Sequence, residues 1–463
     1  MKPTRSFRAG FIIYSLYLWP EMTKLHHIAC AALCIAACTP SSFEDSGEFP
    51  PIRPDYIGVT VPEGLAPLRY EMQDGRRFME RRERRGDTLF ISVSAWEKGA
   101  RRGISYKPFP VYISKDPIDP YISYRLIEPN YESWRDMGIY TRELASFKER
   151  ALVTNRATGG GCVNCHNLPG GDPARMMFHA RGKGGGTVFI DEGDARILNL
   201  ASVGPGRQGT YPAWHPSGRY IAYSSNTTRQ AFPIIGTQPV EVYDTASDII
   251  LFDTASDSVQ LVSGLSGPEA METFPAWSSD GKTLYYCSAP GVSDVVKERA
   301  VIHYALMAID FEDGSFVGEP RTVWSSDTLS VSFPRVYGDR LLFTVSAFGT
   351  FPIWHKEADL MLMNLSNGEV LGAAALNSDD TESYHSWSSN GKWVVFSSRR
   401  LGGRYTRLFI AHFDGEGGFG KPFLLPQRKM SHNDLRLKSY NIPEFVQGNP
   451  GSYEKKVKKL FGR

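Results

Sequence analysis

The sequence predicts an all-β protein, and three observations support this class. Short apolar runs that alternate with polar residues, separated by proline and glycine, occupy residues 55–130. A unit that joins an aromatic residue, proline and tryptophan recurs in the second half of the chain. Each full copy is followed by Ser-Gly, Asp-Gly or Asn-Gly, which favour tight turns, and then by an alternating strand.

Composition excludes some classes of partner. The 463 residues include 52 lysines and arginines and 50 aspartates and glutamates, for a formal net charge of +2. Because these charges are spread along the chain, we expect no nucleic acid partner. Three of the six cysteines lie in an apolar N-terminal segment, two lie in one motif and Cys287 stands alone, so they do not form a disulfide framework. Cys287 alternates within a predicted strand and is expected to be a buried, inert thiol.

The N-terminal segment is typical of a bacterial signal peptide. Residues 24–38 have a basic start, an apolar run and small residues before Cys38. The run is too short to cross a membrane, which takes about 20 apolar residues. Ile35-Ala36-Ala37-Cys38 resembles the lipobox of bacterial lipoproteins, which implies that Cys38 is lipidated and anchors the protein. We therefore predict a signal peptide over residues 1–38 with a true start at Met22; simple cleavage near Ala37 or an N-terminal membrane anchor are the alternatives.

Three segments separate the signal peptide from the repeats. Residues 39–54, rich in Ser, Pro, Glu and Asp, are predicted to be a flexible tether. Residues 55–130 are predicted to form a small antiparallel, sandwich-like β domain, which carries no recognisable catalytic residues. In residues 131–186 apolar side chains first recur at mixed spacings of three and four, which predicts one or two short helices before a loop.

A Cys-x-x-Cys-His motif lies in that third segment, formed by Cys162, Cys165 and His166. In an exported protein this spacing predicts a covalently bound c-type haem. The two thiols would bond to the vinyl groups of one porphyrin, and His166 would be the proximal ligand of the iron. Export and haem attachment support each other, because c-type haem is attached outside the cytoplasm. A zinc site, which normally needs four ligands, and a disulfide are the alternatives.

A second axial ligand is expected a short distance along the chain. A haem iron usually takes this ligand from histidine or methionine. His179 follows His166 closely enough for a loop to fold over the porphyrin edge, and we predict it as the distal ligand. Met177 and Met176 are alternatives, as is an open or remote site. Arg181 and Lys183 could pair with the haem propionates or belong to a glycine-rich turn.

The repeated unit indicates the architecture of the remaining chain. It is clear in three copies and weaker in a fourth: Thr210-Tyr211-Pro212-Ala213-Trp214, Thr273-Phe274-Pro275-Ala276-Trp277, Ser383-Tyr384-His385-Ser386-Trp387 and Ser332-Phe333-Pro334-Arg335. These copies resemble the WD40-like repeats of TolB-type β-propellers. The resemblance implies a propeller of about six blades over residues 187–430, with the three tryptophans packed between blades. Residues 431–463 are expected to close a blade and then fray as a basic tail.

These features predict a lipid-anchored protein of the bacterial cell envelope, at the outer membrane or on the periplasmic face, with one covalent haem c. It would serve electron transfer or redox-dependent recognition rather than catalysis, and its propeller would bind an envelope protein or a redox partner. One alternative is a haem-free, TolB-like protein-binding propeller. The other is a periplasmic haem oxidoreductase. Fold alone does not choose between them.

Overall fold

The computed structural model describes residues 39–128, 136–204, 208–232, 240–298 and 301–462. The predicted signal peptide, the start at Met22 and the lipidation site Cys38 lie outside the described residues. In the part of the chain that is described, no helix has both the length and the hydropathy needed to span a membrane.

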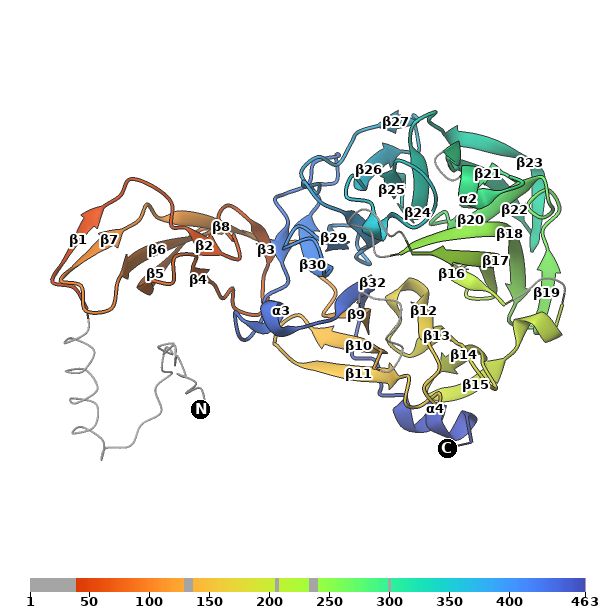
Figure 1. Cartoon of the computed structure of the whole chain (residues 1–463), viewed down its shortest axis with the longest axis horizontal. Helices are drawn as coiled ribbons and strands as arrows, with labels where there is room; N and C mark the ends of the chain where they lie inside the picture. Colours follow the sequence, from red (N-terminus) through yellow and green to blue (C-terminus); the bar gives the residue numbers. More distant parts are fainter. Residues whose placement is uncertain (1–38, 129–135, 205–207, 233–239, 299–300, 463) are drawn as a thin grey trace.

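The described chain begins with a small β domain that stands beside the propeller (Figure 1). Its main sheet has six strands: β1 (Ser42–Asp45), β3 (Thr60–Pro62), β5 (Arg77–Arg85), β6 (Thr88–Trp96), β7 (Arg102–Ser105) and β8 (Phe109–Ser114). A second sheet pairs β2 (Ile52–Arg53) with β4 (Glu71–Met72). The main sheet is mixed rather than antiparallel as expected, because β1 pairs with β7 and β3 pairs with β8 in parallel.

The prediction of a flexible tether over residues 39–54 is wrong. Strand β1 pairs with β7 over four residues, and Ile52 is only 2% exposed in the core of the domain. The polar composition of this segment suggested a solvated chain. However, a polar strand can complete a sheet edge because the pairing uses backbone groups.

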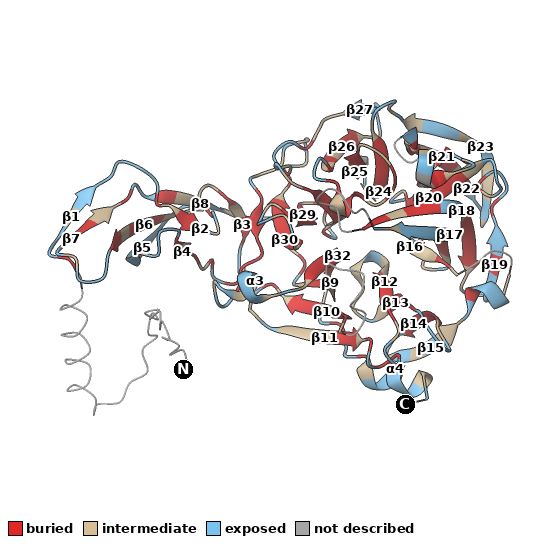
Figure 2. Cartoon of the chain, in the orientation of Figure 1, coloured by how far each residue is buried: buried red, intermediate tan, exposed pale blue. Residues whose placement is uncertain are grey.

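Six four-stranded antiparallel sheets form the propeller, so the prediction of about six blades is confirmed (Figure 1). From the innermost strand outward, the first three blades are β32 (Ser439–Val446), β9 (Tyr121–Ile127), β10 (Gly138–Glu143), β11 (Glu149–Thr154); β12 (Val163–Asn167), β13 (Arg175–Ala180), β14 (Gly186–Asp191), β15 (Asp194–Leu198); and β16 (Thr210–Trp214), β17 (Tyr220–Ala231), β18 (Glu241–Asp253), β19 (Ser258–Leu261). The last three are β20 (Ala270–Trp277), β21 (Thr283–Pro290), β22 (Ala305–Glu312), β23 (Ser315–Trp324); β24 (Ser330–Tyr337), β25 (Arg340–Ser346), β26 (Asp359–Asn364), β27 (Glu369–Val370); and β28 (Glu382–Trp387), β29 (Trp393–Ser398), β30 (Arg407–His412), β31 (Phe423–Leu424). Figure 2 shows the mostly buried inner strands β20 and β24 and an exposed outer rim at β19 and β23.

The propeller starts earlier in the chain than predicted, at β9, and the helices expected in residues 131–155 are wrong where the structure describes them. Strands β10 and β11 pair there as a hairpin, with Ile139 opposite Val153. Both side chains are fully buried. Two short strands joined by a turn, whose buried residues come in adjacent pairs, produced the mixture of spacings that suggested a helix.

The C-terminal segment closes the ring, as predicted. Strand β32 pairs antiparallel with β9, so blade 1 combines strands from both ends of the propeller sequence. The expected fraying is wrong, because residues 454–460 form helix α4 (Glu454–Leu460), which contacts blades 1 and 2. Val457 is fully buried, and the Glu454 carboxylate accepts hydrogen bonds from Thr154 N (2.7 Å) and Oγ1 (2.6 Å). One apolar stripe therefore holds an otherwise basic helix in place.

The innermost strands share a backbone irregularity. Each has one residue with positive φ and a register shift at that point; these residues are Cys165, Tyr211, Phe274, Phe333, Tyr384 and Ile442. The four aromatic members contact one another in sequence, with ring centroids 4.1–4.8 Å apart. The tryptophans pack between blades as expected: Trp277 donates to Ala213 O (3.0 Å) and Trp387 to Arg335 O (3.2 Å) of the preceding blade.

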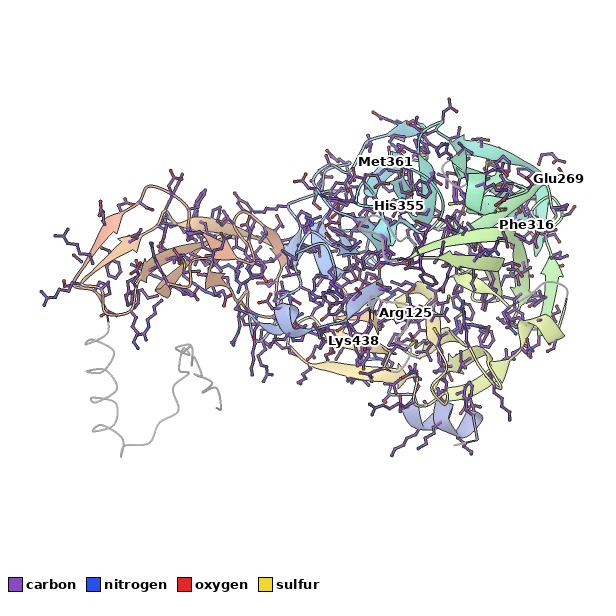
Figure 3. All side chains as sticks on the ribbon, viewed as in Figure 1. Arg125, Glu269, Phe316, His355, Met361 and Lys438 are labelled. Carbon is purple, nitrogen blue, oxygen red and sulfur yellow. The ribbon has the colours of Figure 1, made fainter. Side chains whose placement is uncertain are left out.

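A buried ion pair, extended by the exposed Glu357 to a triad, links blade 3 to blade 5. Glu241 begins β18, and its Oε2 lies 2.8 Å from Nε2 of His355, which follows the short 3-10 helix η4 (Pro352–Trp354). The other ring nitrogen of His355 lies 3.2 Å from Glu357 Oε1. Burial would lower the pKa of His355, but hydrogen bonds and charges from both glutamates outweigh it and raise the pKa to about 9. Figure 3 places His355 on the inner side of blade 5.

This triad predicts a loss of stability at alkaline pH. The folded pKa of His355 exceeds its ordinary value near 6.5, so the contribution is complete below pH 6.5 and is lost as pH rises through 9. The shift corresponds to about 3 kcal/mol. Urea unfolding between pH 6 and 10 should show this decline in the native chain and a flatter profile in Glu241→Gln/His355→Gln. Parallel profiles would contradict the assignment.

Candidate functional site

The Cys-x-x-Cys-His motif is built into the propeller itself. Cys162 directly precedes β12, and Cys165 and His166 lie within this innermost strand of blade 2. The chain enters the strand through Gly161, where a Cβ would lie 1.9 Å from Arg181 O, so only glycine fits that approach. Cys165 has φ of 50° and occupies the place that Tyr211 has in the next blade. The motif is therefore one degenerate copy of the inner-strand repeat.

The two cysteines are free and almost fully buried. Cys162 is 7% exposed and packs in the core shared by blades 1 and 2, which also contains Met137 and Val163. Cys165 is 6% exposed. Burial raises the pKa of its thiol, although the charges of Arg125 and Arg181 oppose this. The Cys165 thiol is thus protonated at neutral pH, and the two cysteines are not joined as a disulfide.

His166 is a buried, neutral imidazole. Its side chain is 0% exposed, and its Nε2 lies 3.6 Å from Glu444 Oε2 on β32. Burial, reinforced by the Arg125 charge, lowers the pKa of His166 to about 3. Burial also raises the pKa of Glu444 to about 8, and this carboxyl accepts a hydrogen bond from Asn167. The two groups therefore face each other uncharged at pH 7.

Several polar atoms around the motif have no hydrogen-bond partner among the described residues. They are both ring nitrogens of His166, Oδ1 of Asn164, Oε2 of Glu444 and Nε of Arg125. Arg125 lies on β9 opposite Asn441 of β32, and Figure 3 places it near the centre of the ring. Buried polar groups are normally paired, and each unpaired group costs about 1–3 kcal/mol. Such a concentration of unpaired atoms indicates a place where a ligand belongs.

The structure distinguishes the three candidates for the second axial ligand of the iron. His179 lies on β13 opposite Asn164, is 4% exposed and has an Nδ1 without a partner among the described residues. Burial, then the Arg181 charge, lowers its pKa to about 4, so it is neutral. Met177 Sδ already accepts a hydrogen bond from Tyr223 (3.2 Å), and Met176 packs in the core of blades 1 and 2.

Other predicted groups near the motif remain at the surface. Arg181 and Lys183 are exposed. In the described part of the chain, no group of three or more His, Cys, Asp or Glu side chains is arranged to hold a metal ion.

Sequence reasoning missed two residues of this site, Arg125 and Glu444. Each lies far from the motif in sequence and reaches it only because β32 and β9 pair. Glu444 nevertheless had a signal: Asn441-Ile442-Pro443-Glu444-Phe445 follows the same pattern as the quoted repeats and forms the innermost strand of blade 1. A search that allowed Ile in the aromatic position would have found it.

No family model matches the chain, and no curated protein matches it, so the resemblance to TolB-type repeats remains a prediction. Solved structures match weakly. An oligogalacturonate lyase in complex with manganese has 13% identity and a TM-score of 0.38 over 66% of this chain and 75% of that one. The β-propeller domain of the Trilobed protease from Pyrococcus furiosus has 10% identity and a TM-score of 0.35, covering 74% and 83%. A puromycin hydrolase mutant has 13% identity and a TM-score of 0.40, covering 67% and 53%. These likenesses are too distant to transfer any activity.

Proposed function

We propose that this protein is a monohaem c-type cytochrome in which a six-bladed propeller carries the haem on the inner strand of blade 2. Cys162 and Cys165 would hold the haem covalently, and His166 would be the proximal ligand. The observation that carries the proposal is His166, a fully buried neutral imidazole with both ring nitrogens unpaired among the described residues, next to two free thiols. The function would be electron transfer or redox-dependent recognition.

The donor set fits a haem in chemical terms. Thioether bonds need reduced cysteines, and iron coordination needs an unprotonated imidazole, so both requirements are met at neutral pH. A bound haem c supplies one-electron chemistry. The chain's own contribution is to fix His166 beside Glu444 and to exclude water, since burial and the positive charge of Arg125 favour the neutral ligand.

The burial of the motif also bears on the order of assembly. The two cysteines and His166 are 2–7% exposed in the closed ring, and β32 covers them from blade 1. Groups buried to this extent are inaccessible to an attachment enzyme. We therefore place haem attachment before β32 pairs with β9.

The lipobox supports a lipid anchor at Cys38 and a place in the bacterial cell envelope, with a redox or envelope protein as the partner of the propeller. Cys38→Ala should release the protein from membranes into the soluble envelope fraction. The fractionation of the native chain and this variant tests the anchor independently of the haem.

The second candidate function is a haem-free binding propeller. It is favoured by the equivalence of Cys165 to Tyr211, Phe274, Phe333 and Tyr384, whose rings contact one another as packing residues of the innermost strands. The deciding experiment is a pyridine haemochrome assay and a haem stain on a denaturing gel, with protein matured in a host that attaches c-type haem. One covalent haem per chain is expected. A fully folded chain without haem would contradict the cytochrome proposal and favour the haem-free binding propeller.

The proposal predicts different effects for the candidate distal ligands. Replacement His179→Ala should retain covalent haem but convert a six-coordinate, low-spin iron to a five-coordinate, high-spin one. The reason is that His179 alone among the candidates has a free ring nitrogen in the described structure. Met177→Leu should leave the spin state unchanged because Met177 contacts Tyr223. Absorption and electron paramagnetic resonance spectra measure this, and the opposite result would exclude His179.

A further inference from the structure

A second candidate site lies at the edge of the propeller, away from the cysteine motif. It is a cavity of about 420 Å³ between the β10–β11 turn of blade 1 and residues 427–436, which connect blade 6 to β32. The short helix α3 (His432–Leu435) forms part of this wall and lies beside β10 in Figure 1. The volume is in the range of small-molecule sites.

One wall of the cavity is a buried guanidinium without a counter-ion. Arg142 is 2% exposed, and its guanidinium donates to neutral acceptors: Gln427 Oε1 (3.0 Å), Pro426 O (2.5 Å) and Ser146 O (3.4 Å). Among the described residues no carboxylate lies within 4 Å of it. A buried charge that is hydrogen-bonded but not neutralised is costly, and a nearby anion lowers that cost.

Further positive charges surround the same place. Arg436 pairs with Glu149 (2.8 Å), whereas the 4% exposed Arg407 donates only to backbone carbonyls, those of Arg436 and Asn433 among them. The acidic Asp434 lies at the surface and faces Arg53 at 3.6 Å. Burial, followed by the Arg436 charge, lowers the pKa of His432 to about 4, so this histidine remains neutral.

The rim adds two exposed cations and an apolar surface. Arg428 and Lys429 are exposed at the mouth, and neither has a carboxylate within 4 Å in the described part of the chain. Phe147 lines the interior with Arg69 5.4 Å and Arg142 5.7 Å from its ring centroid. Leu435, which also lines the cavity, is 75% exposed. The lining thus combines three donors of positive charge at the mouth and flank with two apolar side chains.

We infer that this cavity binds an organic anion, a phosphate or carboxylate joined to an apolar group. The anionic group would lie among Arg428, Lys429 and Arg436, in the field of Arg142. The apolar group would lie between Phe147 and Leu435. Excess positive charge explains the first preference, and the exposed leucine explains why an inorganic anion would leave part of the site unfilled. The inference does not depend on the haem.

Isothermal titration calorimetry with three probes tests the inference on the full chain, whether or not it carries haem. Octyl phosphate should bind at least about tenfold more tightly than inorganic phosphate, and octyl glucoside, which shares the tail but lacks the charge, should bind no better than inorganic phosphate. Equal binding of octyl phosphate and octyl glucoside would overturn the proposal.

Surface variants avoid the risk that a buried-arginine variant fails to fold. Arg428→Glu/Lys429→Glu should weaken octyl phosphate at least about tenfold. The control Lys98→Glu/Arg101→Glu makes the same charge change at exposed positions of the β domain and should leave binding unchanged. An equal loss of octyl phosphate affinity in both variants would show that net charge alone causes the effect, and it would overturn the proposed site.

Vesicles identify the source of the anion. Co-sedimentation of the Cys38→Ala chain with phosphatidylglycerol but not phosphatidylcholine vesicles, lost when Arg428→Glu/Lys429→Glu is added, would assign the site to a lipid headgroup. Binding of octyl phosphate without vesicle binding would assign it to a free metabolite. Binding to neither overturns the inference.

Discussion

Replacing both cysteines of the motif, Cys162→Ala/Cys165→Ala, is expected to abolish covalent haem. Each thiol forms one of the two bonds that hold a c-type haem through denaturation. The double variant should therefore give no haem stain on a denaturing gel and no haemochrome signal in the protein fraction. Because both side chains are small and buried, the loss of stability should be about 1–2 kcal/mol each, which leaves the propeller folded.

Cys287→Ala provides a matched control. Cys287 is also a free, fully buried thiol, but it lies on β21 in blade 4. This variant should lose similar stability and keep all of its haem. Retention of covalent haem in the double variant, or equal loss in the control, would remove the motif as the attachment site.

Removal of the C-terminal strand is expected to have the largest effect on folding. A chain that ends at Lys438 lacks β32, whose Tyr440, Phe445 and Val446 are 0–4% exposed. Loss of a single buried aromatic costs about 3–5 kcal/mol, so these residues together approach the whole stability of a typical domain. We expect rapid proteolysis and no cooperative unfolding transition. Near-ultraviolet circular dichroism and limited proteolysis measure both.

A second truncation separates closure from simple shortening. A chain that ends at Gly451 keeps β32 and loses α4, which buries Val457 and Tyr453. It should unfold cooperatively at a lower temperature. If attachment precedes closure, the chain ending at Lys438 should still become haem-stained, despite its failure to fold. A folded propeller in the absence of β32 would contradict the role assigned to the strand.

The correct predictions depend on patterns of residues close together in the sequence, and the incorrect ones depend on pairing between separate segments. The repeated aromatic-proline-tryptophan units predicted blades because the same local contacts recur in each one, as the bond from Trp277 to Ala213 O illustrates. The helix expected in residues 131–155 failed because Ile139 and Val153 are brought together by pairing across a turn. Spacing along the chain cannot distinguish that arrangement from a helix. The prediction of a flexible tether was wrong because β1 is held by backbone hydrogen bonds to β7. Amino-acid composition carries no information about such bonds.

The sequence by itself determined the all-β class, the repeated blades and the donor groups that the motif offers, because turn residues, alternation and the Cys-x-x-Cys-His spacing are local properties. Only the tertiary structure decided where that chemistry lies. Ring closure by β32 places Glu444 3.6 Å from His166 and Arg125 near the centre, although these residues are far apart in the chain. Burial then sets the charge of each group, lowering the pKa of His166 to about 3 and raising that of Glu444 to about 8. Desolvation depends on every strand that surrounds a residue, so no local stretch of sequence can encode it.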